Sequence, residues 1–185
     1  LSGYTQTSRS GIVALKPAII HVNWLGFPGS MGHASFANGH KRPLFDYLIS
    51  DAFITPAASA QDYAEKLAIL PCYQANDSQR PLADAPTRAS CQLPEGAFVY
   101  CCFNQTFKIS AEVFSVWMRL LKTQAHSVLW LLECNPWAKQ NLMNAAMAQG
   151  VSANRLVFAP RLPIAEHLAR HVHADLFLDT LPYNA

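Results

Sequence analysis

Two polar side chains that follow a buried strand pattern are the first residues of this chain that could do chemistry. The apolar run "GAFVYCCF" (residues 96–103) ends just before Asn104, Gln105 and Lys108, and Ser110 then opens a helical pattern. Ligands of parallel sheets bind beyond the carboxyl ends of the strands, where the N-terminus of the next helix favours an anion. Gln105 and Lys108 therefore predict a phosphate site. The alternative is a solvated loop lysine beside a glutamine that pairs with local backbone groups.

A second strand-end loop carries further basic side chains. The segment "FAPRLPIAEHLAR" (158–170) places Arg161, His167 and Arg170 near the same predicted edge, so that both loops could serve one site. Three histidines within residues 167–173 also suggest a metal, but no carboxylate or thiolate stands at matching spacing. We expect neither a metal ion nor a cofactor at this edge.

Strand and helix patterns alternate through the second half of the chain. Buried strands are predicted at 97–103, 127–132, 155–160 and 175–180, and helices at 110–124, 135–150 and 164–174. Strands that are apolar on both faces and alternate with helices are typical of a parallel sheet covered by helices. The pattern therefore predicts an α/β fold with a Rossmann-like half.

The first two predicted helices carry clear start and packing signals. In the first helix, Ser110 is the expected N-cap, and Phe114, Trp117 and Leu121 recur at helical spacing. We expect these three apolar residues to pack against the sheet and not to form an acceptor surface. The second helix, 135–150, begins with an Asn–Pro pair and ends at a glycine, which are typical boundary residues.

Residues 1–90 form a separate α/β piece in the predicted organisation. A strand with a Gly/Pro loop, further strand structure and a short amphipathic helix are predicted at 18–32, 45–56 and 59–70. Ser30 lacks the Gly-x-Ser-x-Gly context of a hydrolase nucleophile. The Asn-, Ser- and Pro-rich segment 74–96 is the expected linker, and a boundary near residue 90 divides the chain into 1–90 and 91–185.

Composition and charge exclude several classes of partner. A formal net charge of +2 with 14% charged residues gives no basic face for nucleic acid or for a membrane surface. The longest apolar stretches fall far short of the roughly 20 residues that span a bilayer, and we expect no secretory leader before the first residue. We therefore expect a cytoplasmic protein. Five cysteines without a CxxC pair predict free, buried thiols in a reducing compartment.

Eight segments of the chain resemble, in order, one known family. They include "GYTQTSRSGIVALKPAIIHVNWLGFPGSMG", "FNQTFKI", "AEHLAR" and "ADLFLDTLPYNA". They are similar to the catalytic region of the O-linked N-acetylglucosamine transferases and the SPINDLY-type proteins, over nearly the whole chain. The resemblance implies a GT-B architecture of two Rossmann-like lobes, here with an incomplete second lobe, usually preceded by tetratricopeptide repeats. It also implies a glycosyltransferase that moves a sugar, expected to be N-acetylglucosamine from UDP-GlcNAc, to Ser or Thr of proteins, with inversion and without a metal.

Family roles carry over onto residues of the strand-end loops. The resemblance implies a donor-binding set of Gln105, Lys108, Leu162, His167, Arg170 and Tyr183. Lys108 matches the lysine that contacts the diphosphate and stabilises the leaving group, and Gln105 matches a glutamine at the phosphates. His167 and Arg170 match positions around the uridine, and Leu162 matches a residue whose backbone meets the uracil edge. A fixed ammonium would offset the charge that builds on the departing diphosphate.

Four features depart from the family pattern. Residues 33–43 lie where a much shorter connection is expected, and Ile164 replaces a lysine that many relatives carry near the ribose. The chain shows no 34-residue repeat and stops before the family's His-Thr-Thr turn, so we expect part of a longer protein whose isolated residues are inactive.

Two other functional readings follow from the same residues. One is a non-catalytic fragment that binds a nucleotide sugar or another protein. A dehydrogenase or kinase is disfavoured because no Gly-x-Gly-x-x-Gly follows a strand. Whether the donor sugar is N-acetylglucosamine or fucose is left open by the sequence.

Overall fold

The computed structural model describes residues 8–74 and 77–185, and the chain divides into two compact units, 1–78 and 79–185. The predicted linker, 74–96, spans this division. Its later part belongs to the second unit because it packs there: Leu93 is buried, and the His173 ring nitrogen Nε2 is hydrogen-bonded to the Pro86 carbonyl oxygen at 2.6 Å. The assignment of 1–90 and 91–185 to two catalytic lobes stays a prediction.

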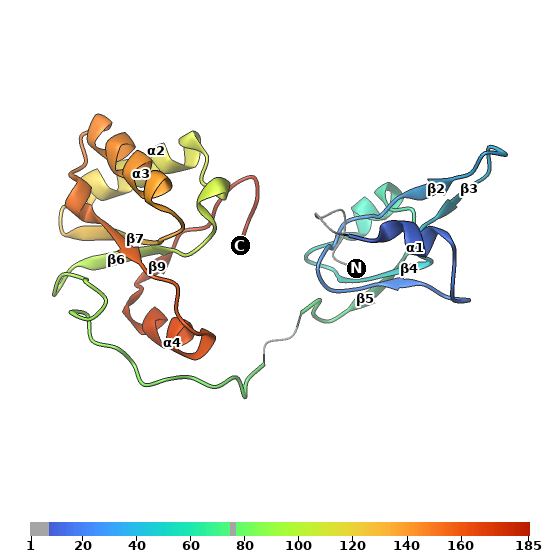
Figure 1. The fold of residues 1–185 in the computed structure, drawn as a ribbon, viewed down its shortest axis with the longest axis horizontal. Coiled ribbons are helices and arrows are strands. Elements are labelled where there is room, and N and C mark those ends of the chain that lie inside the picture. Colours follow the sequence, from blue (N-terminus) through green and yellow to red (C-terminus); the bar gives the residue numbers. More distant parts are fainter. Residues whose placement is uncertain (1–7, 75–76) are drawn as a thin grey trace. The chain divides into compact units, whose positions relative to one another are not determined.

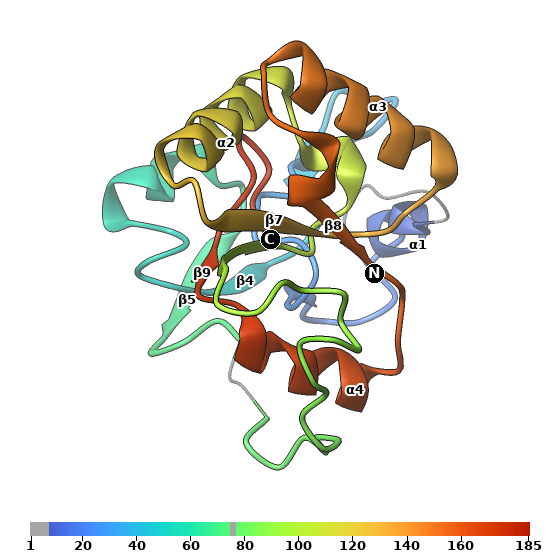
Figure 2. The same ribbon diagram turned by 90° about the vertical axis from the view of Figure 1, so that its left-hand side faces the viewer.

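The second unit is built on a four-stranded parallel sheet with the strand order β8-β7-β6-β9. Its strands are β6 (Phe98–Cys102), β7 (Ser127–Leu132), β8 (Leu156–Ala159) and β9 (Leu176–Phe177). Helices α2 (Ala111–Thr123) and α3 (Pro136–Ala148) cover one face, and α4 (Ile164–Ala169) lies on the other, as Figures 1 and 2 show. Three 3-10 turns occur at Thr106–Lys108, Ala153–Arg155 and Arg170–His173. The predicted parallel sheet with helices on both faces is confirmed.

Two apolar layers hold this sheet between its helices. One layer joins Tyr100, Cys102, Leu129, Leu131 and Phe158 to helices α2 and α3, and the other joins Val99, Cys101, Val128, Trp130 and Val157 to Leu93. Successive strand residues point to opposite faces, which is why the adjacent Cys101 and Cys102 lie in different layers. Phe114, Trp117 and Leu121 are 4%, 4% and 1% exposed, so the prediction that they are core residues is confirmed.

The ends of α2 and α3 follow their sequence signals. Ser110 Oγ accepts a hydrogen bond from Val113 N at 3.3 Å, and Asn135 Oδ1 accepts one from Ala138 N at 2.8 Å. Each bond satisfies a backbone donor that a helix start otherwise leaves unpaired. Gly150, just past α3, has a φ of +75°, a conformation that favours glycine.

The strand order changes direction at β6. The chain runs from β6 to β7 and β8 on one side, and then crosses to β9 on the other side of β6. The loops after β6 and β9 therefore leave the same edge of the sheet from neighbouring strands. Such a switch point is the place where open α/β sheets bind ligands.

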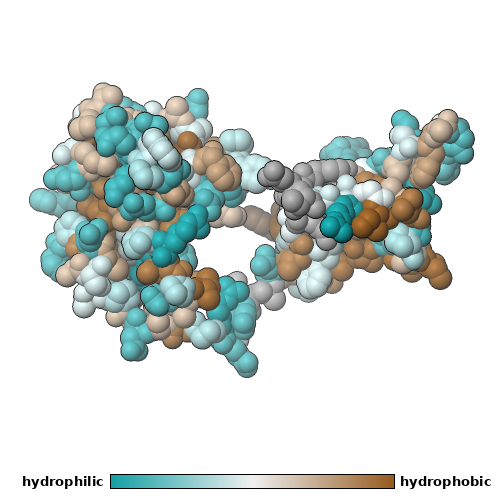
Figure 3. All heavy atoms as spheres, viewed as in Figure 1, coloured by the Kyte–Doolittle hydropathy of each residue, from teal (hydrophilic) through white to brown (hydrophobic). Residues whose placement is uncertain are grey.

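The first unit contains a three-stranded parallel sheet in the order β1-β4-β5. Its elements are α1 (Ser10–Ala14), β1 (Val22–Asn23), a hairpin of β2 (His33–Ser35) and β3 (Lys41–Pro43), β4 (Tyr47–Asp51), a 3-10 turn (Ala57–Asp62) and β5 (Lys66–Leu70). The hairpin occupies the predicted insertion at 33–43. Apolar side chains are exposed over α1 in Figure 3, where Ile12 and Leu15 are 51% and 81% exposed.

The predicted helix over 59–70 is wrong. Lys66–Leu70 is a strand paired in parallel register with β4, and only a 3-10 turn, Ala57–Asp62, precedes it. A continuous apolar run of four residues, 67–70, fits a strand as well as a helix, and periodicity alone does not separate the two. Parallel pairing with β4 makes residues 66–70 a strand.

Candidate functional site

Side-chain hydrogen bonds join the carboxyl ends of β6 and β9. Asn104 Nδ2 donates to Asp179 Oδ1 at 3.0 Å and to Thr180 Oγ1 at 2.8 Å. Asp179 also accepts from the backbone N–H groups of Thr180 and Ala185, and the fully buried Thr180 donates to the Tyr183 carbonyl oxygen. These bonds hold the segment after β9 against the end of β6. We call Asn104, Asp179 and Thr180 the strand-end clasp.

The clasp also sets the charge of its carboxylate. Desolvation by neighbouring atoms raises the pKa of Asp179, but hydrogen bonds from Thr180 N, Ala185 N and the Asn104 and Asn184 amides outweigh this effect and hold the pKa below its usual range. Asp179 is therefore an anion whose oxygens are occupied by donors. It is a structural turn-forming group and not a free base.

Lys108 lies against the segment that the clasp holds. Its Nζ donates to the Asn184 carbonyl oxygen at 2.7 Å and lies 5.4 Å from the centre of the Tyr183 ring. An ammonium has three N–H donors, and among the described residues Lys108 Nζ uses one of them, so donors remain for a ligand. Lys108 ends the 3-10 turn Thr106–Lys108 and precedes the α2 N-cap, Ser110, by two residues.

Gln105 has a carboxamide whose orientation is fixed by its neighbours. Its Oε1 accepts from Arg161 Nη2 at 3.1 Å and from Cys134 Sγ at 3.6 Å. A guanidinium only donates, so the oxygen of the amide must be the atom that faces Arg161. The amide nitrogen then has no hydrogen-bond partner among the described residues, and it is available to donate to an acceptor at the sheet edge.

His167 and Arg170 form a packed pair on the α4 side. Arg170 is 2% exposed, and its guanidinium lies over the Phe103 ring. The guanidinium donates hydrogen bonds to the Pro160 carbonyl oxygen at 2.7 Å and to His167 Nδ1. Burial, followed by the charges of Arg170 and His171, lowers the pKa of His167 to about 4. His167 is thus neutral near pH 7, with its proton on Nε2. Arg170 supports the ring from a buried position.

A cavity of about 490 Å³ opens beside this pair. Its lining includes Trp130, Glu133, Phe158, Leu162 and Arg170, together with residues 90–92 of the loop that precedes β6. Leu162 and Arg170 are thus brought together, whereas Gln105, Lys108 and Tyr183 lie outside this lining. The predicted donor-binding residues form two groups along one edge, one around Lys108 and the other around Arg170, and their roles stay predictions.

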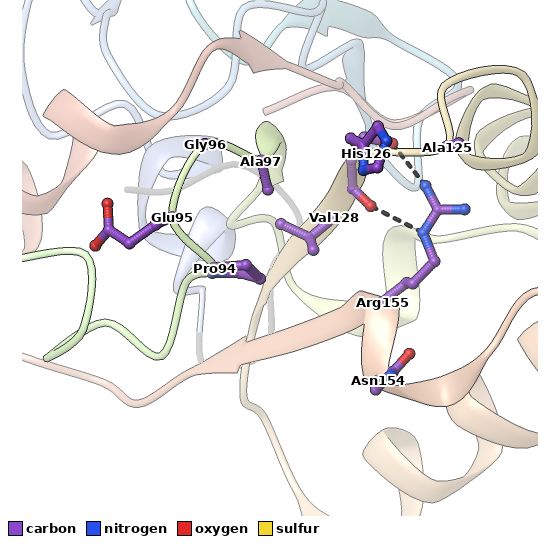
Figure 4. Close-up of a pocket in the computed structure, with 10 residues that line it drawn as sticks. Pro94, Glu95, Gly96, Ala97, Ala125, His126, Val128, Asn154 and Arg155 are labelled. Atoms are coloured by element: carbon purple, nitrogen blue, oxygen red, sulfur yellow. Dashed lines mark hydrogen bonds between the residues drawn. The ribbon is translucent and has the colours of Figure 1, made fainter.

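The opposite edge of the sheet is also hollowed. A space of about 290 Å³ is lined by Pro94, His126 and Arg155 among others, and Figure 4 shows the Arg155 side chain turned onto the start of β7. Arg155 Nε donates to the Ser127 carbonyl oxygen, and Nη2 donates to Gln124 O and Ser127 Oγ. Because these donors already have protein partners, Arg155 holds the turn before β7 and does not form a ligand site.

The clasp and Cys134 were not among the candidates that the sequence suggested. Asn104 directly follows a predicted strand, which is the same signal that identified Gln105 and Lys108, whereas Asp179 lies inside the strand predicted at 175–180. Their pairing depends on β9 lying next to β6, and this neighbourhood is not visible in the sequence pattern.

Other expectations can be compared with the described part of the chain. All five cysteines are free, as predicted, but the expectation that they are buried holds only for Cys101 and Cys102 and is wrong for the exposed Cys72. No group of three His, Cys, Asp or Glu side chains gathers as a metal site among residues 8–74 and 77–185. Within the same ranges, no helix has the length and apolar character needed to cross a membrane.

Comparison with known proteins identifies relatives over nearly the whole chain. A family model described as glycosyl transferase family 41 matches residues 1–83 and 74–185. The probable UDP-N-acetylglucosamine–peptide N-acetylglucosaminyltransferase SEC of Arabidopsis thaliana is 37% identical over 187 residues, which cover 97% of this chain and 18% of that protein. The corresponding SPINDLY protein of Petunia hybrida is 29% identical over 192 residues, covering 99% and 19%. The chain thus spans about a fifth of the length of these curated relatives.

A solved structure supports the same grouping. A mutant O-GlcNAc transferase of Thermobaculum terrenum matches with a TM-score of 0.75 at 29% identity, over 94% of this chain and 31% of that chain. The family resemblance and the α/β fold class of GT-B type that the sequence predicted are confirmed.

Proposed function

The chain belongs to glycosyl transferase family 41, and on that premise we propose that its carboxyl-edge residues form part of the donor site of a protein glycosyltransferase. The proposed reaction transfers N-acetylglucosamine from UDP-GlcNAc to Ser or Thr side chains of proteins, with inversion and without a metal. The names of the SEC and SPINDLY relatives, which state a UDP-N-acetylglucosamine donor and a peptide acceptor, support both substrate classes.

The observation that carries this proposal is the placement of Lys108. Its ammonium is tethered to the Asn184 carbonyl oxygen at the switch point and retains donors for a ligand, and the free amide nitrogen of Gln105 belongs to the same strand-end loop. Breaking a sugar–phosphate bond loads negative charge onto the diphosphate. A fixed cation at that position interacts more strongly with the transition state than with the bound donor, and therefore lowers the barrier.

The same reasoning supports a reaction without a metal. It also supports separate positions along the edge for the base and for the diphosphate of the donor. Lys108 would supply the positive charge at the leaving group that a divalent cation supplies in metal-dependent transferases. The neutral His167 ring and the cavity lined by Leu162 and Arg170 suit an uncharged, flat group such as the base of the nucleotide. The diphosphate would then lie towards Gln105 and Lys108.

The test is a transfer assay with the full-length protein that contains this chain. UDP-GlcNAc labelled in the sugar is incubated with a peptide that has a single serine, in the presence of EDTA, and the anomeric configuration of the product is read by NMR. The proposal expects labelled peptide with an inverted linkage. Binding of UDP without transfer would support the non-catalytic alternative, and absence of UDP binding would contradict both.

A further inference from the structure

Arg161 is a cation at the carboxyl edge to which the proposed donor site gives no role. It follows β8, its side chain is exposed, and its Nη2 donates to Gln105 Oε1 at 3.1 Å. The ion pairs of the described residues are Lys16–Asp46, Arg88–Asp175 and Lys139–Glu133. Arg161 therefore has no carboxylate partner within the described part of the chain.

Two carboxylates that follow strands at this edge are already engaged. Glu133, which follows β7, pairs with Lys139 at 3.3 Å, and Asp179, which follows β9, is occupied by the donors of the strand-end clasp. Neither forms an ion pair with Arg161 or Lys108 within the described residues. The edge therefore presents two cations from different strand ends, β8 and β6, and this arrangement favours an anionic ligand.

The geometry of the guanidinium fits such a ligand. Arginine offers five N–H donors in a rigid planar fork that matches the spacing of phosphate oxygens. One of these donors is fixed on Gln105, which restricts the side chain and leaves the others available. The Gln105 amide nitrogen is also a donor without a partner among the described residues. Arg161 and Gln105 thus offer donors and no free acceptor, which is what phosphate oxygens require.

We propose that Arg161 is a further donor-binding residue, which fixes the Gln105 carboxamide with one N–H and binds an oxygen of the donor diphosphate with another. This inference rests on the proposed function, because it takes the nucleoside diphosphate of the sugar donor as its ligand. It adds a second cation to the site, at the end of β8, whereas Lys108 stands at the end of β6.

Calorimetric titration of the full-length protein with UDP, UMP and uridine tests the inference. Arg161→Gln should bind UDP about tenfold more weakly than the wild type, as expected for loss of one charge-assisted contact, with uridine affinity unchanged. The effect should persist when Gln105→Ala is also present, because the contact with phosphate is direct. Arg119→Gln, which removes an exposed arginine from α2, is the matched control and should bind all three ligands as the wild type does.

The outcomes separate this inference from the function on which it rests. If the wild type binds no UDP, the proposed donor site is wrong and Arg161 loses its ligand. If the wild type binds UDP and Arg161→Gln binds it equally well, the donor site stands and the inference is overturned. An effect that disappears in the Gln105→Ala background would also overturn the direct contact.

Discussion

Removing the Asn104 amide should loosen the turn that holds Lys108. Asn104→Ala deletes two hydrogen bonds, to Asp179 at 3.0 Å and to Thr180 at 2.8 Å. One charge-assisted and one neutral hydrogen bond, if each contributed fully, would together stabilise the folded state by about 2–4 kcal/mol. Asp179 is exposed and keeps its backbone donors, and Thr180 still donates to Tyr183, so no buried group is left unpaired. We therefore expect a loss of about 1–2 kcal/mol in the free energy of unfolding.

Urea denaturation measures this loss, and hydrogen exchange localises it. The amides of Thr180 and Ala185, which both donate to Asp179, should exchange faster in Asn104→Ala than in the wild type. The matched control is Asn144→Ala, because Asn144 is an exposed asparagine of α3 whose amide oxygen accepts from Gln140. Wild-type exchange at both amides, or a stability loss no larger than that of Asn144→Ala, would refute the role of the clasp.

Three further predictions address the core, a histidine and the thiols. Trp117→Ala should lose about 3–5 kcal/mol of unfolding free energy, measured in urea, because it empties a buried site between α2 and the sheet. His167 has a folded-state pKa of about 4 against an ordinary value of 6.5, so the unfolded state binds its proton first. The stability of the wild type should therefore fall as pH drops from 6.5 towards 4, and His167→Gln should show a smaller fall in urea midpoints measured at pH 7.5 and pH 5. Burial raises the pKa of Cys101 to about 12 and that of Cys102 to about 11, so iodoacetamide at pH 8 should label the exposed Cys72 and spare both until urea is added, as peptide mass spectrometry would show.

Local signals in the sequence predicted much of the second unit. Ser110 and Asn135 cap their helices as expected, and Phe114, Trp117 and Leu121 are buried. These features could be predicted because each depends on residues within one helical turn or along one helix face. The ends of β6, β7 and β8 also lie within one residue of the apolar runs that predicted them, whereas β9 ends at Phe177, before the predicted end at residue 180. This local information was enough to place Gln105 and Lys108 at one edge of a parallel sheet.

Features that depend on tertiary neighbours could not be predicted in the same way. Lys66–Leu70 is a strand because β4 offers it a parallel partner, and its apolar run alone does not reveal that partner. The bonds from Asn104 to Asp179 cross 75 residues and exist because β9 lies next to β6. The burial of Arg170, which was expected to meet the ligand, likewise follows from how α4 packs onto the Phe103 side of the sheet.

The most direct test of the donor-site assignment is the turnover of Lys108→Met in the full-length protein. The assay measures transfer of labelled sugar to a peptide, alongside thermal melting and UDP binding of each variant. The account predicts an intact fold with turnover lower by roughly 10²-fold or more, because the charge that Lys108 offsets is larger in the transition state than in the bound donor. Lys108→Arg should recover only part of the activity, since a planar fork does not reproduce a compact ammonium. Full turnover by Lys108→Met, with saturable donor binding, would contradict the account.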